Sequence, residues 1–97
     1  MPHCHEFAVF TVKKENQARV IELSQSLFKE MNSDKKILVS HEILEKTDNK
    51  EEICWHLVWI NKTAVEENKQ KWSTFPSSTE LESLVGERLY YGHFIAV

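Results

Sequence analysis

The segment ICWHLVWI, residues 53 to 60, reads as a β-strand with large apolar residues on both of its faces. Side chains along a strand point alternately to opposite sides, so Trp55 and Trp59 share one face and His56 lies on the other. HEFAVFTV, residues 5 to 12, is a second strand that is apolar on both faces. A sheet with one face in water alternates apolar and polar residues. The chain must therefore fold so that both faces of a sheet are covered.

The rest of the sequence predicts two more strands and a long helix. Residues 16 to 32 repeat apolar side chains at helical spacing, which indicates an amphipathic helix. Residues 37 to 44 predict a strand that forms a hairpin with residues 53 to 60 around Asp48 and Asn49. Residues 88 to 97 predict the last strand.

A second helix is predicted by the capping box T-x-x-E, with Thr63 as the N-cap and Glu66 completing the box. This helix should run from residue 64 to about residue 73, because Pro76 prevents its continuation. Residues 78 to 85 predict a short third helix, which Gly86 ends in the C-terminal cap position.

The predicted order is β-α-β-β-α-β, the ferredoxin-like arrangement of an α+β fold with helices on one face of an antiparallel sheet. Nothing in the 97 residues indicates a linker or a repeat, so we predict a single domain over residues 1–97. The helices can cover only one face of the sheet. A second copy of the same sheet, related by a two-fold axis, is the simplest cover for the other face. We therefore expect a homodimer through the sheet face, which forms a dimeric α/β barrel.

The composition excludes several partners. The net charge is −3 and the 12 lysines and arginines are dispersed, so we predict no nucleic-acid partner. No apolar run approaches the length of about 18 residues that a membrane span needs. No basic segment precedes an apolar one at the N-terminus, as it would in a signal peptide. These features predict a cytoplasmic protein with no membrane partner. Cys4 and Cys54 stand outside any C-x-x-C motif, and we expect both thiols to be reduced.

Three stretches resemble one protein family: Trp59 followed by NKTAVEEN, the aromatic-proline break FPSS, and YYGHF in the last strand. They are similar to the antibiotic biosynthesis monooxygenase type of dimeric α/β barrel. The resemblance covers nearly the whole chain in the order of elements, and residues 59 to 75 in local pattern. It implies a cofactor-independent monooxygenase that acts on a small aromatic or quinone-like ligand in a cavity between sheet and helices.

The sequence departs from that family at one position. Many members carry a histidine four residues after the alanine that matches Ala64, and here Asn68 stands there. An amide cannot act as a base near neutral pH, so the resemblance implies that Asn68 orients a substrate oxygen or stabilises an anion. Haem-degrading relatives need an axial histidine on or just after the second helix, and residues 62 to 85 contain none. We therefore expect no cofactor.

Asn68 is also unusual by spacing alone, because it shares one helical face with Val65, Trp72 and Phe75. A buried amide without a partner costs about 1–3 kcal/mol, so it should meet a ligand, a backbone group or a trapped water. We predict that Asn68 and Tyr91 act on the substrate. Five further residues are predicted to contact the ligand: Ser24, Trp55, Trp59, Trp72 and Phe75.

These residues also have structural interpretations. Ser24 interrupts the apolar stripe of the first helix and could bond back to a carbonyl one turn earlier. Large aromatic side chains such as Trp55 and Trp59 commonly fill the core of a small domain. Tyr91 shares strand parity with His93, and it could equally be an exposed residue at the sheet edge.

Four histidines fall on four different predicted strands. A two-residue turn at Asp48 and Asn49 would place His41 opposite His56 and Ile43 opposite Cys54. The resulting group of His41, His56 and Cys54 has the ligand chemistry of a zinc or copper site. A shift of one residue in the hairpin would separate these side chains. Two histidines in a dimer interface are the commoner outcome, and we predict no metal site.

Two other functions remain open at this stage. The same dimeric barrel could be a non-catalytic ligand-binding or interaction protein, which the lack of a base on the second helix favours. The N-terminal MPH resembles the start of tautomerase-family enzymes, in which a free proline amine is the base. Tautomerase is the lesser alternative, because Met1 precedes Pro2 in this sequence.

Overall fold

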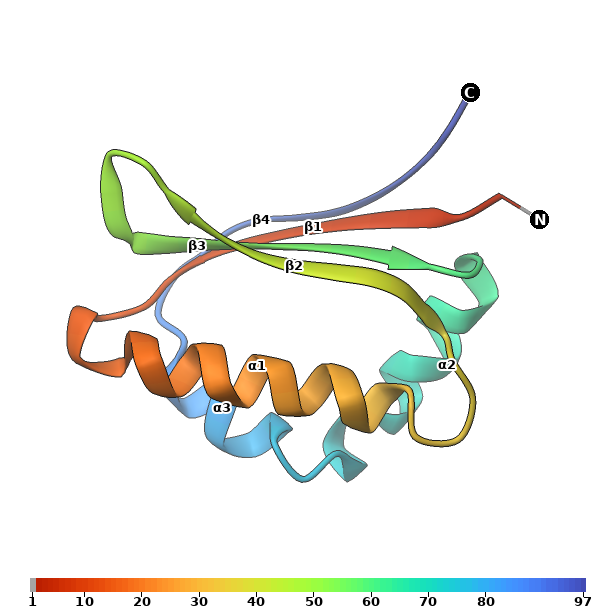
Figure 1. The fold of residues 1–97 in the computed structure, drawn as a ribbon, viewed down its shortest axis with the longest axis horizontal. Coiled ribbons are helices and arrows are strands. Elements are labelled where there is room, and N and C mark those ends of the chain that lie inside the picture. The colour runs from red at the N-terminus through yellow and green to blue at the C-terminus, as the bar shows by residue number, and fades with distance from the viewer. Residues whose placement is uncertain (1) are drawn as a thin grey trace.

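The computed structural model describes residues 2–97 and contains four strands and three α-helices (Figure 1). Their bounds in chain order are β1 (Cys4–Thr11), α1 (Gln17–Met31), β2 (Leu38–Lys46), β3 (Asn49–Trp59), α2 (Lys62–Lys71), α3 (Ser78–Leu84) and β4 (Arg88–Ile95). Short 3₁₀ turns, Lys14–Asn16 and Trp72–Thr74, precede α1 and follow α2. None of these helices is long and apolar enough to cross a membrane, as far as residues 2–97 show.

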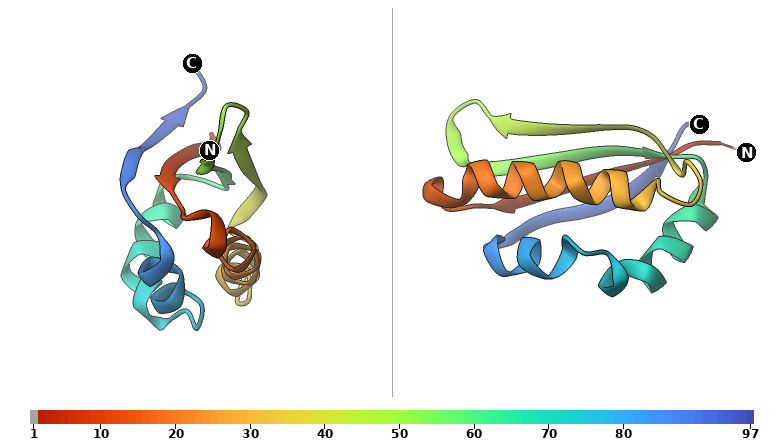
Figure 2. Two further views of the ribbon diagram at one scale, coloured as in Figure 1. Left: turned by 90° about the vertical axis from the view of Figure 1, so that its left-hand side faces the viewer. Right: turned by 60° about the horizontal axis from the view of Figure 1, so that its bottom comes forward.

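The strands form one antiparallel sheet in the order β2-β3-β1-β4. The two views in Figure 2 show that all three helices lie against the same face of this sheet. The predicted ferredoxin-like β-α-β-β-α-β fold is therefore confirmed. The sheet leaves its opposite face, called here the outer face, without a covering helix.

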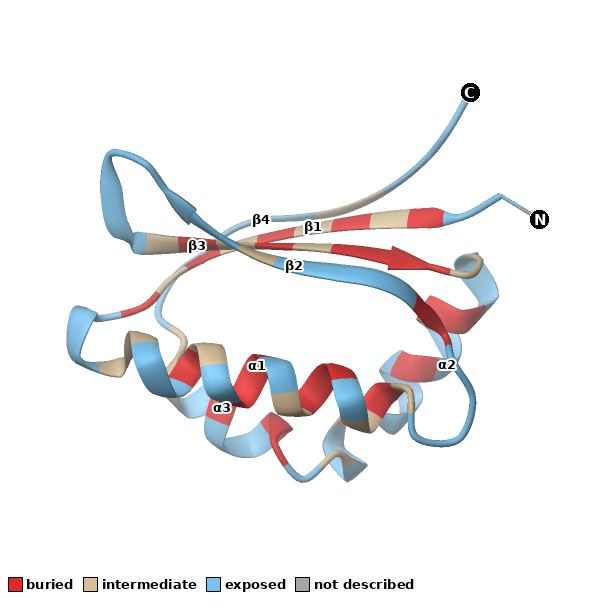
Figure 3. Ribbon diagram, in the orientation of Figure 1, coloured by how far each residue is buried: buried red, intermediate tan, exposed pale blue. Residues whose placement is uncertain are grey.

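The hydrophobic core lies between the sheet and the helices, where buried residues alternate along β1 and gather on the inner side of α1 (Figure 3). Trp55 belongs to this layer, and its ring packs edge-on against Phe28 of α1 with centroids 5.0 Å apart. Trp59 is also buried in the core. Both tryptophans thus lie on the helix side, as their shared strand parity predicts.

The outer face carries His56, as predicted, beside apolar side chains. The His56 ring stacks on Phe7 with centroids 4.5 Å apart, and its Nε2 atom lies 3.3 Å from Nδ1 of His5. Leu44, Tyr90 and Phe94 are exposed although they are large and apolar or aromatic. This face is therefore not built like the water-facing side of an ordinary antiparallel sheet.

The register that a two-residue turn at Asp48 and Asn49 would give the β2–β3 hairpin is not observed, and the pairing at His41 differs from it by one residue. Irregularities in the pairing at both ends of β2 shift the strand, so that His41 faces Leu57 and Glu42 faces His56. His41 consequently points to the helix side, where its ring lies 4.8 Å from that of Phe28. Because a one-residue shift moves side chains to the opposite face, the group of His41, His56 and Cys54 that a two-residue turn at Asp48 and Asn49 would assemble does not form.

The predicted N-cap of the second helix is also wrong. Helix α2 begins at Lys62, and Asn61 is its N-cap, with Asn61 Oδ1 accepting a hydrogen bond of 2.8 Å from the amide of Ala64. Asparagine is as good an N-cap as threonine. β3 ends at Trp59 and α2 begins at Lys62, so the N-cap position falls on Asn61 and Thr63 already lies within the first turn of the helix.

Gly86 does not adopt the left-handed cap conformation that its position after α3 suggested, since no described glycine has a positive φ. Its amide instead donates a hydrogen bond of 2.8 Å to the carbonyl of Thr11 at the end of β1. A Cβ atom on Gly86 would lie 2.4 Å from Thr11 Oγ1. Glycine is therefore required here by a close approach between the loop that precedes β4 and the end of β1.

The two thiols are free, as predicted. Cys54 is paired with Val9, while Cys4 is paired with Trp59 at the other end of the same two strands. Cys4 is buried on the helix side and Cys54 lies on the outer face, so the sheet itself separates them.

Candidate active site

A cavity of about 450 Å³ lies between the sheet and the helices. Its volume is within the range of small-molecule sites. The strands contribute Glu6, Ala8, Val9, Phe10, Trp55, Trp59, Arg88, Tyr90 and Tyr91. The helices and the turns after them contribute Met31, Val65, Asn68, Lys69, Trp72, Leu81, Glu82 and Val85.

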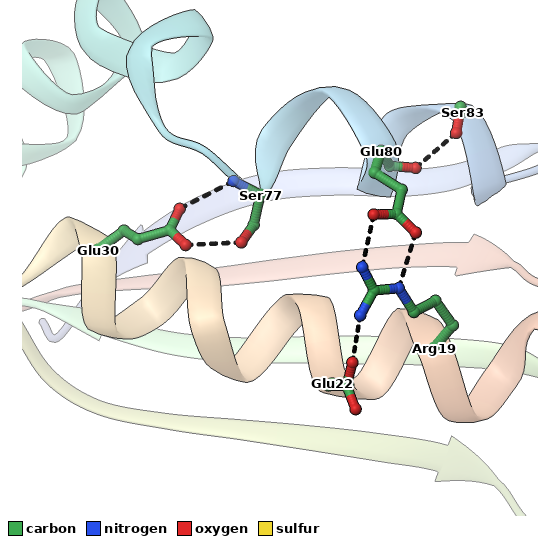
Figure 4. A network of polar contacts seen from close by, with 6 residues as sticks. All are labelled: Arg19, Glu22, Glu30, Ser77, Glu80 and Ser83. Carbon is green, nitrogen blue, oxygen red and sulfur yellow. Dashed lines mark hydrogen bonds and ion pairs between the residues drawn. The ribbon is translucent and has the colours of Figure 1, made fainter.

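Helix α3 forms one wall of this cavity, and polar contacts attach it to α1 (Figure 4). The guanidinium of Arg19 donates two hydrogen bonds to Glu80, of 2.7 Å from Nε and 2.6 Å from Nη2. At the N-cap of α3, Glu30 accepts hydrogen bonds of 3.0 Å and 2.6 Å from the amide and hydroxyl of Ser77. Arg19 and Glu30 lie about three turns apart on α1, so the N-terminal turn of α3 is attached to α1 at two separate points.

Trp55 forms part of the sheet side of the cavity and is held from behind by Ser24. Its Nε1 donates a hydrogen bond of 3.2 Å to Ser24 Oγ, and that hydroxyl donates one of 2.7 Å to the carbonyl of Val20. Ser24 is fully buried and lies outside the set of residues that line the cavity. The structure therefore places Ser24 behind the wall, bonded back to the carbonyl one turn earlier.

Asn68 lines the cavity from α2, where it follows Ala64 and Val65 on the buried side of the helix. Its side chain is only 5% exposed, and its Oδ1 has no hydrogen-bond partner among the described residues. Rotating the amide would bury the NH₂ group in the same place, so one end remains unpaired in either orientation. Asn68 also borders a smaller cavity of about 40 Å³, and Phe75 lines that smaller cavity instead of the main one.

Glu6 is a buried carboxylate in the sheet side of the cavity, with 5% exposure. Its Oε1 accepts a hydrogen bond of 3.2 Å from Trp59 Nε1 and lies 3.0 Å from Nε2 of His93. Burial raises the pKa of Glu6, and this effect exceeds the opposing influence of His93, of the Trp59 hydrogen bond and of the Lys69 charge. Sequence reasoning missed Glu6, although its parity with Ala8 and Phe10 places a charged residue on the buried face of β1.

Tyr91 lies beside this carboxylate in β4. Its hydroxyl is 3.5 Å from His93 Nε2, and the two rings meet edge-to-face with centroids 5.0 Å apart. Burial, followed by the negative charge of Glu6, raises the pKa of Tyr91 to about 12. Tyr91 is therefore protonated at neutral pH and can donate a hydrogen bond, but it cannot serve as a base.

Charged side chains gather where the cavity meets solvent. Trp72 donates a hydrogen bond of 2.6 Å from Nε1 to Glu82 Oε1, and that oxygen lies 3.8 Å from a guanidinium nitrogen of Arg88. Glu82 and Arg88 are exposed, and both line the cavity. The hydrogen bond fixes the edge of the Trp72 ring at this rim.

The structure thus brings together five of the seven residues that the sequence suggested for a site, namely Asn68, Tyr91, Trp55, Trp59 and Trp72. Ser24 and Phe75 lie outside the main cavity. Glu6, which the sequence did not suggest, is the buried carboxylate of the sheet side, and its Oε1 contacts His93, which lies outside the cavity lining.

The fold is shared with several solved structures. A candidate antibiotic biosynthesis monooxygenase from Caulobacter crescentus matches with a TM-score of 0.82 and 8% identity, over 99% of this chain and 91% of that chain. SnoaB, a cofactor-independent oxygenase from Streptomyces nogalater, matches with a TM-score of 0.75 and 19% identity, over 100% of this chain and 95% of that chain. A conserved protein from Bacteroides thetaiotaomicron, named as a possible oxidoreductase, matches with a TM-score of 0.77 and 12% identity, over 98% of both chains.

No protein-family model matches the sequence, and no curated protein is similar to it. The structural matches extend over almost the full length of both chains, so the whole chain adopts the fold of the antibiotic biosynthesis monooxygenase group of dimeric α/β barrels. At identities of 8% and 19%, the likeness concerns the fold. Any activity must be argued from the cavity itself.

Proposed function

We propose that the chain is a cofactor-independent monooxygenase that oxidises a small phenolic substrate in the cavity between the sheet and the helices. The observation that carries this proposal is the unpaired amide of Asn68 in the wall of a largely apolar cavity. A buried acceptor without a partner costs about 1–3 kcal/mol, and a substrate hydroxyl would supply the missing hydrogen bond. The fold it shares with SnoaB, a cofactor-independent oxygenase, supports the same reaction class.

The walls favour a flat, aromatic substrate. Trp55, Trp59 and Trp72 contribute three indole rings to one cavity, and aromatic ligands gain from offset or edge-to-face contacts with such rings. Tyr91 remains protonated and can donate a hydrogen bond to a substrate oxygen. A phenol or hydroquinone combines an aromatic ring with hydroxyl groups for Asn68 and Tyr91.

The reaction uses dioxygen as the oxidant and the substrate as the source of electrons. Loss of the hydroxyl proton leaves a phenolate, whose electron-rich ring carbon forms a bond to one atom of dioxygen. The resulting peroxide takes up a proton, its O–O bond breaks, and the ring C–H proton leaves with the released hydroxide as water. One oxygen atom thus remains as a quinone carbonyl and the other leaves in water, so a phenol and dioxygen become a quinone and water. Polar groups held in a water-poor cavity would stabilise the phenolate on which this sequence depends.

We also propose that a second copy of the chain covers the outer face of the sheet. Phe7, Val9 and Cys54 are only half-buried there, and Leu44 and Phe94 are exposed. An apolar face on an antiparallel sheet needs a cover, and a second copy of the same sheet, related by a two-fold axis, is the simplest one. Sheet-to-sheet packing would leave the cavity on the helix side open to substrate.

Binding and oxygen uptake test the proposed function separately. Quenching of tryptophan fluorescence measures binding of a panel of phenols and hydroquinones, and an oxygen electrode measures uptake without added metal or flavin. Wild-type protein should bind a phenol and consume one dioxygen per substrate, with one labelled oxygen atom from the gas retained in the product. Asn68→Leu should lose binding, while the control Gln70→Leu, which changes an exposed amide on the same helix, should behave as wild type. Binding without oxygen uptake would favour the non-catalytic ligand-binding protein, and no binding at all would refute the proposal.

A further inference from the structure

We infer that Glu6 is the base of this site: its carboxylate accepts the hydroxyl proton of the bound phenol and later returns that proton to the peroxide. This inference rests on the proposed function and adds to it the residue that starts the reaction. Asn68 cannot act as a base, so a phenol-oxidising cavity of this kind needs a proton acceptor from another element.

The other titratable groups in the cavity wall do not fit this role. The wall contains six titratable side chains, namely Glu6, Lys69, Glu82, Arg88, Tyr90 and Tyr91. Lys69 and Arg88 are exposed cations, and Tyr90 is an exposed residue of β4. Tyr91 keeps its proton because its pKa is raised to about 12. Glu82 is exposed at the rim and accepts a hydrogen bond from Trp72. Glu6 is the buried carboxylate of the set.

The hydrogen bonds of Glu6 leave one oxygen free for a ligand. Trp59 Nε1 and His93 Nε2 both contact Oε1, at 3.2 Å and 3.0 Å. Oε2 has no hydrogen-bond partner among residues 2–97, and the residue lines the cavity. Two contacts on one oxygen hold the carboxyl group in place, so a substrate hydroxyl in the cavity can approach Oε2 without displacing either of them.

The raised pKa of Glu6 also suits the role of a general base. Burial raises the pKa of its carboxyl group, and a general base is most effective when its pKa approaches the working pH. The nearby groups that titrate or carry charge are His93 and Tyr91 on β4, Lys69 on α2 and Cys4 on β1. His93 and Lys69 lower the pKa of Glu6, but the effect of burial, which raises it, is larger.

The proton transfers balance over the whole reaction. The phenolic O–H bond breaks, its electron pair stays on the substrate oxygen, and the proton binds Oε2. After the ring carbon has bonded to dioxygen, protonated Glu6 gives the same proton to the terminal peroxide oxygen. Glu6 is then a carboxylate again, and the departing water contains this proton and the ring proton.

A chromophoric phenol that resists oxidation can report the first transfer directly. Para-nitrophenol absorbs visible light as its phenolate and not as the neutral phenol. At a pH below the pKa of the free phenol, wild-type protein should bind it as phenolate. Glu6→Gln should bind it with similar affinity as the neutral phenol, and oxidation of a reactive phenol should fall about 100-fold or more. The control Glu45→Gln makes the same chemical change at an exposed position of β2 and should leave both signals unchanged.

Two results would separate this inference from the proposed function. If Glu6→Gln still binds the phenolate and oxidises phenols at the wild-type rate, Glu6 is not the base and the proposed function stands. If wild-type protein neither binds nor oxidises any phenol, the proposed function fails and the inference fails with it.

Wild-type protein alone provides a second test, which does not depend on the folding of a variant. The infrared difference spectrum on binding para-nitrophenol should gain the carbonyl band of a protonated carboxyl group and lose a carboxylate band. Phenolate binding without this gain would overturn the inference, because the proton would then have gone elsewhere.

Discussion

Trp59 of β3 donates its indole N–H to Oε1 of Glu6 on β1 across a distance of 3.2 Å, directly on the sheet side of the cavity. The contact joins one of the two tryptophans of β3 to the buried carboxylate of the sheet. His93 of β4 reaches the same oxygen from the other neighbouring strand. The adjacent strands β3, β1 and β4 are thus joined by one carboxyl group as well as by their backbone hydrogen bonds.

Replacing Glu6 by Gln should stabilise the protein at neutral pH. The glutamine oxygen can still accept both hydrogen bonds, while the cost of burying a negative charge disappears. The pKa of Glu6 is raised above its ordinary value of 4.5, so between the unfolded and folded pKa values the native state binds more protons than the unfolded state. The free energy of unfolding of wild-type protein therefore falls as the pH rises through the folded pKa of Glu6.

Denaturant melts across a pH series measure this effect. The advantage of Glu6→Gln should be greatest above the folded pKa of Glu6 and should vanish below pH 4.5, where the carboxyl group is protonated in both states. Electrostatic interactions with His93 and Lys69 act against the raised pKa of Glu6. If Glu6→Gln proved less stable than wild type at neutral pH, the attraction of His93 and Lys69 for the carboxylate would outweigh its desolvation.

Gly86→Ala should destabilise the fold by about 1–3 kcal/mol, which is typical of overpacking. The new methyl group would lie 2.4 Å from Thr11 Oγ1, which accepts a hydrogen bond of 2.8 Å from the amide of Glu87. The Thr11 hydroxyl cannot move without losing that bond.

Gly92→Ala is the matched control for this substitution. Its Cβ would meet the hydroxyl of Tyr90 at 2.7 Å, and the exposed end of that long side chain can rotate away. Urea melts should therefore show a clearly larger loss for Gly86→Ala than for Gly92→Ala. Equal losses would mean that the contact with Thr11 does not determine the cost at Gly86, because the entropy of the unfolded backbone favours alanine over glycine at both positions.

The sequence predicted the order of the elements because strand and helix periodicities are local properties. It failed where the outcome depends on how two segments meet. The hairpin register was missed because the strand pairing of β2 is irregular at both ends, and a bulge leaves little trace in composition. The role of Gly86 was missed for the same reason, since Thr11 lies far from it in sequence.

The candidate site was only partly predictable. Asn68 was found because a polar residue interrupted an apolar helical face. Glu6 was overlooked because a single acidic residue in a strand is usually assigned to the exposed face. Its parity with Ala8 and Phe10 was visible in the sequence, but the partners that hold it, Trp59 and His93, become neighbours only in the folded sheet.

Phe94→Lys should weaken self-association through the outer face of the sheet. Phe94 is exposed and meets Phe7 edge-on, with ring centroids 5.9 Å apart. A lysine from each copy would bring like charges into an apolar interface, which is strongly unfavourable. Sedimentation equilibrium should show a dimer for wild type at micromolar concentration and the 11.4 kDa monomer for the variant. Gln25→Lys adds the same charge at an exposed position on α1 and should remain dimeric; a monomeric wild type would remove the basis for the sheet-to-sheet assembly.

Asn32 and Asn68 differ in the hydrogen bonding of their side-chain amides. Asn32, after α1, is fully engaged, because its Oδ1 accepts hydrogen bonds of 3.0 Å and 2.9 Å from the amides of Ile37 and Leu38. Asn68 is more deeply buried, yet its Oδ1 has no partner among residues 2–97. Leucine has a similar size to asparagine, so replacing each residue by leucine changes mainly its hydrogen bonding.

Asn32→Leu should lower the free energy of unfolding by about 1–3 kcal/mol, because it leaves two backbone amides without their acceptor. Asn68→Leu should be neutral or stabilising, because it removes a buried polar atom that pairs with nothing in the free protein. Denaturant melts of both variants beside wild type measure the contrast. A loss for Asn68→Leu as large as that for Asn32→Leu would mean that the Asn68 amide is already paired without a ligand. Its hydrogen bond would then not be available to a substrate, and the strongest support for a phenol-binding cavity would be gone.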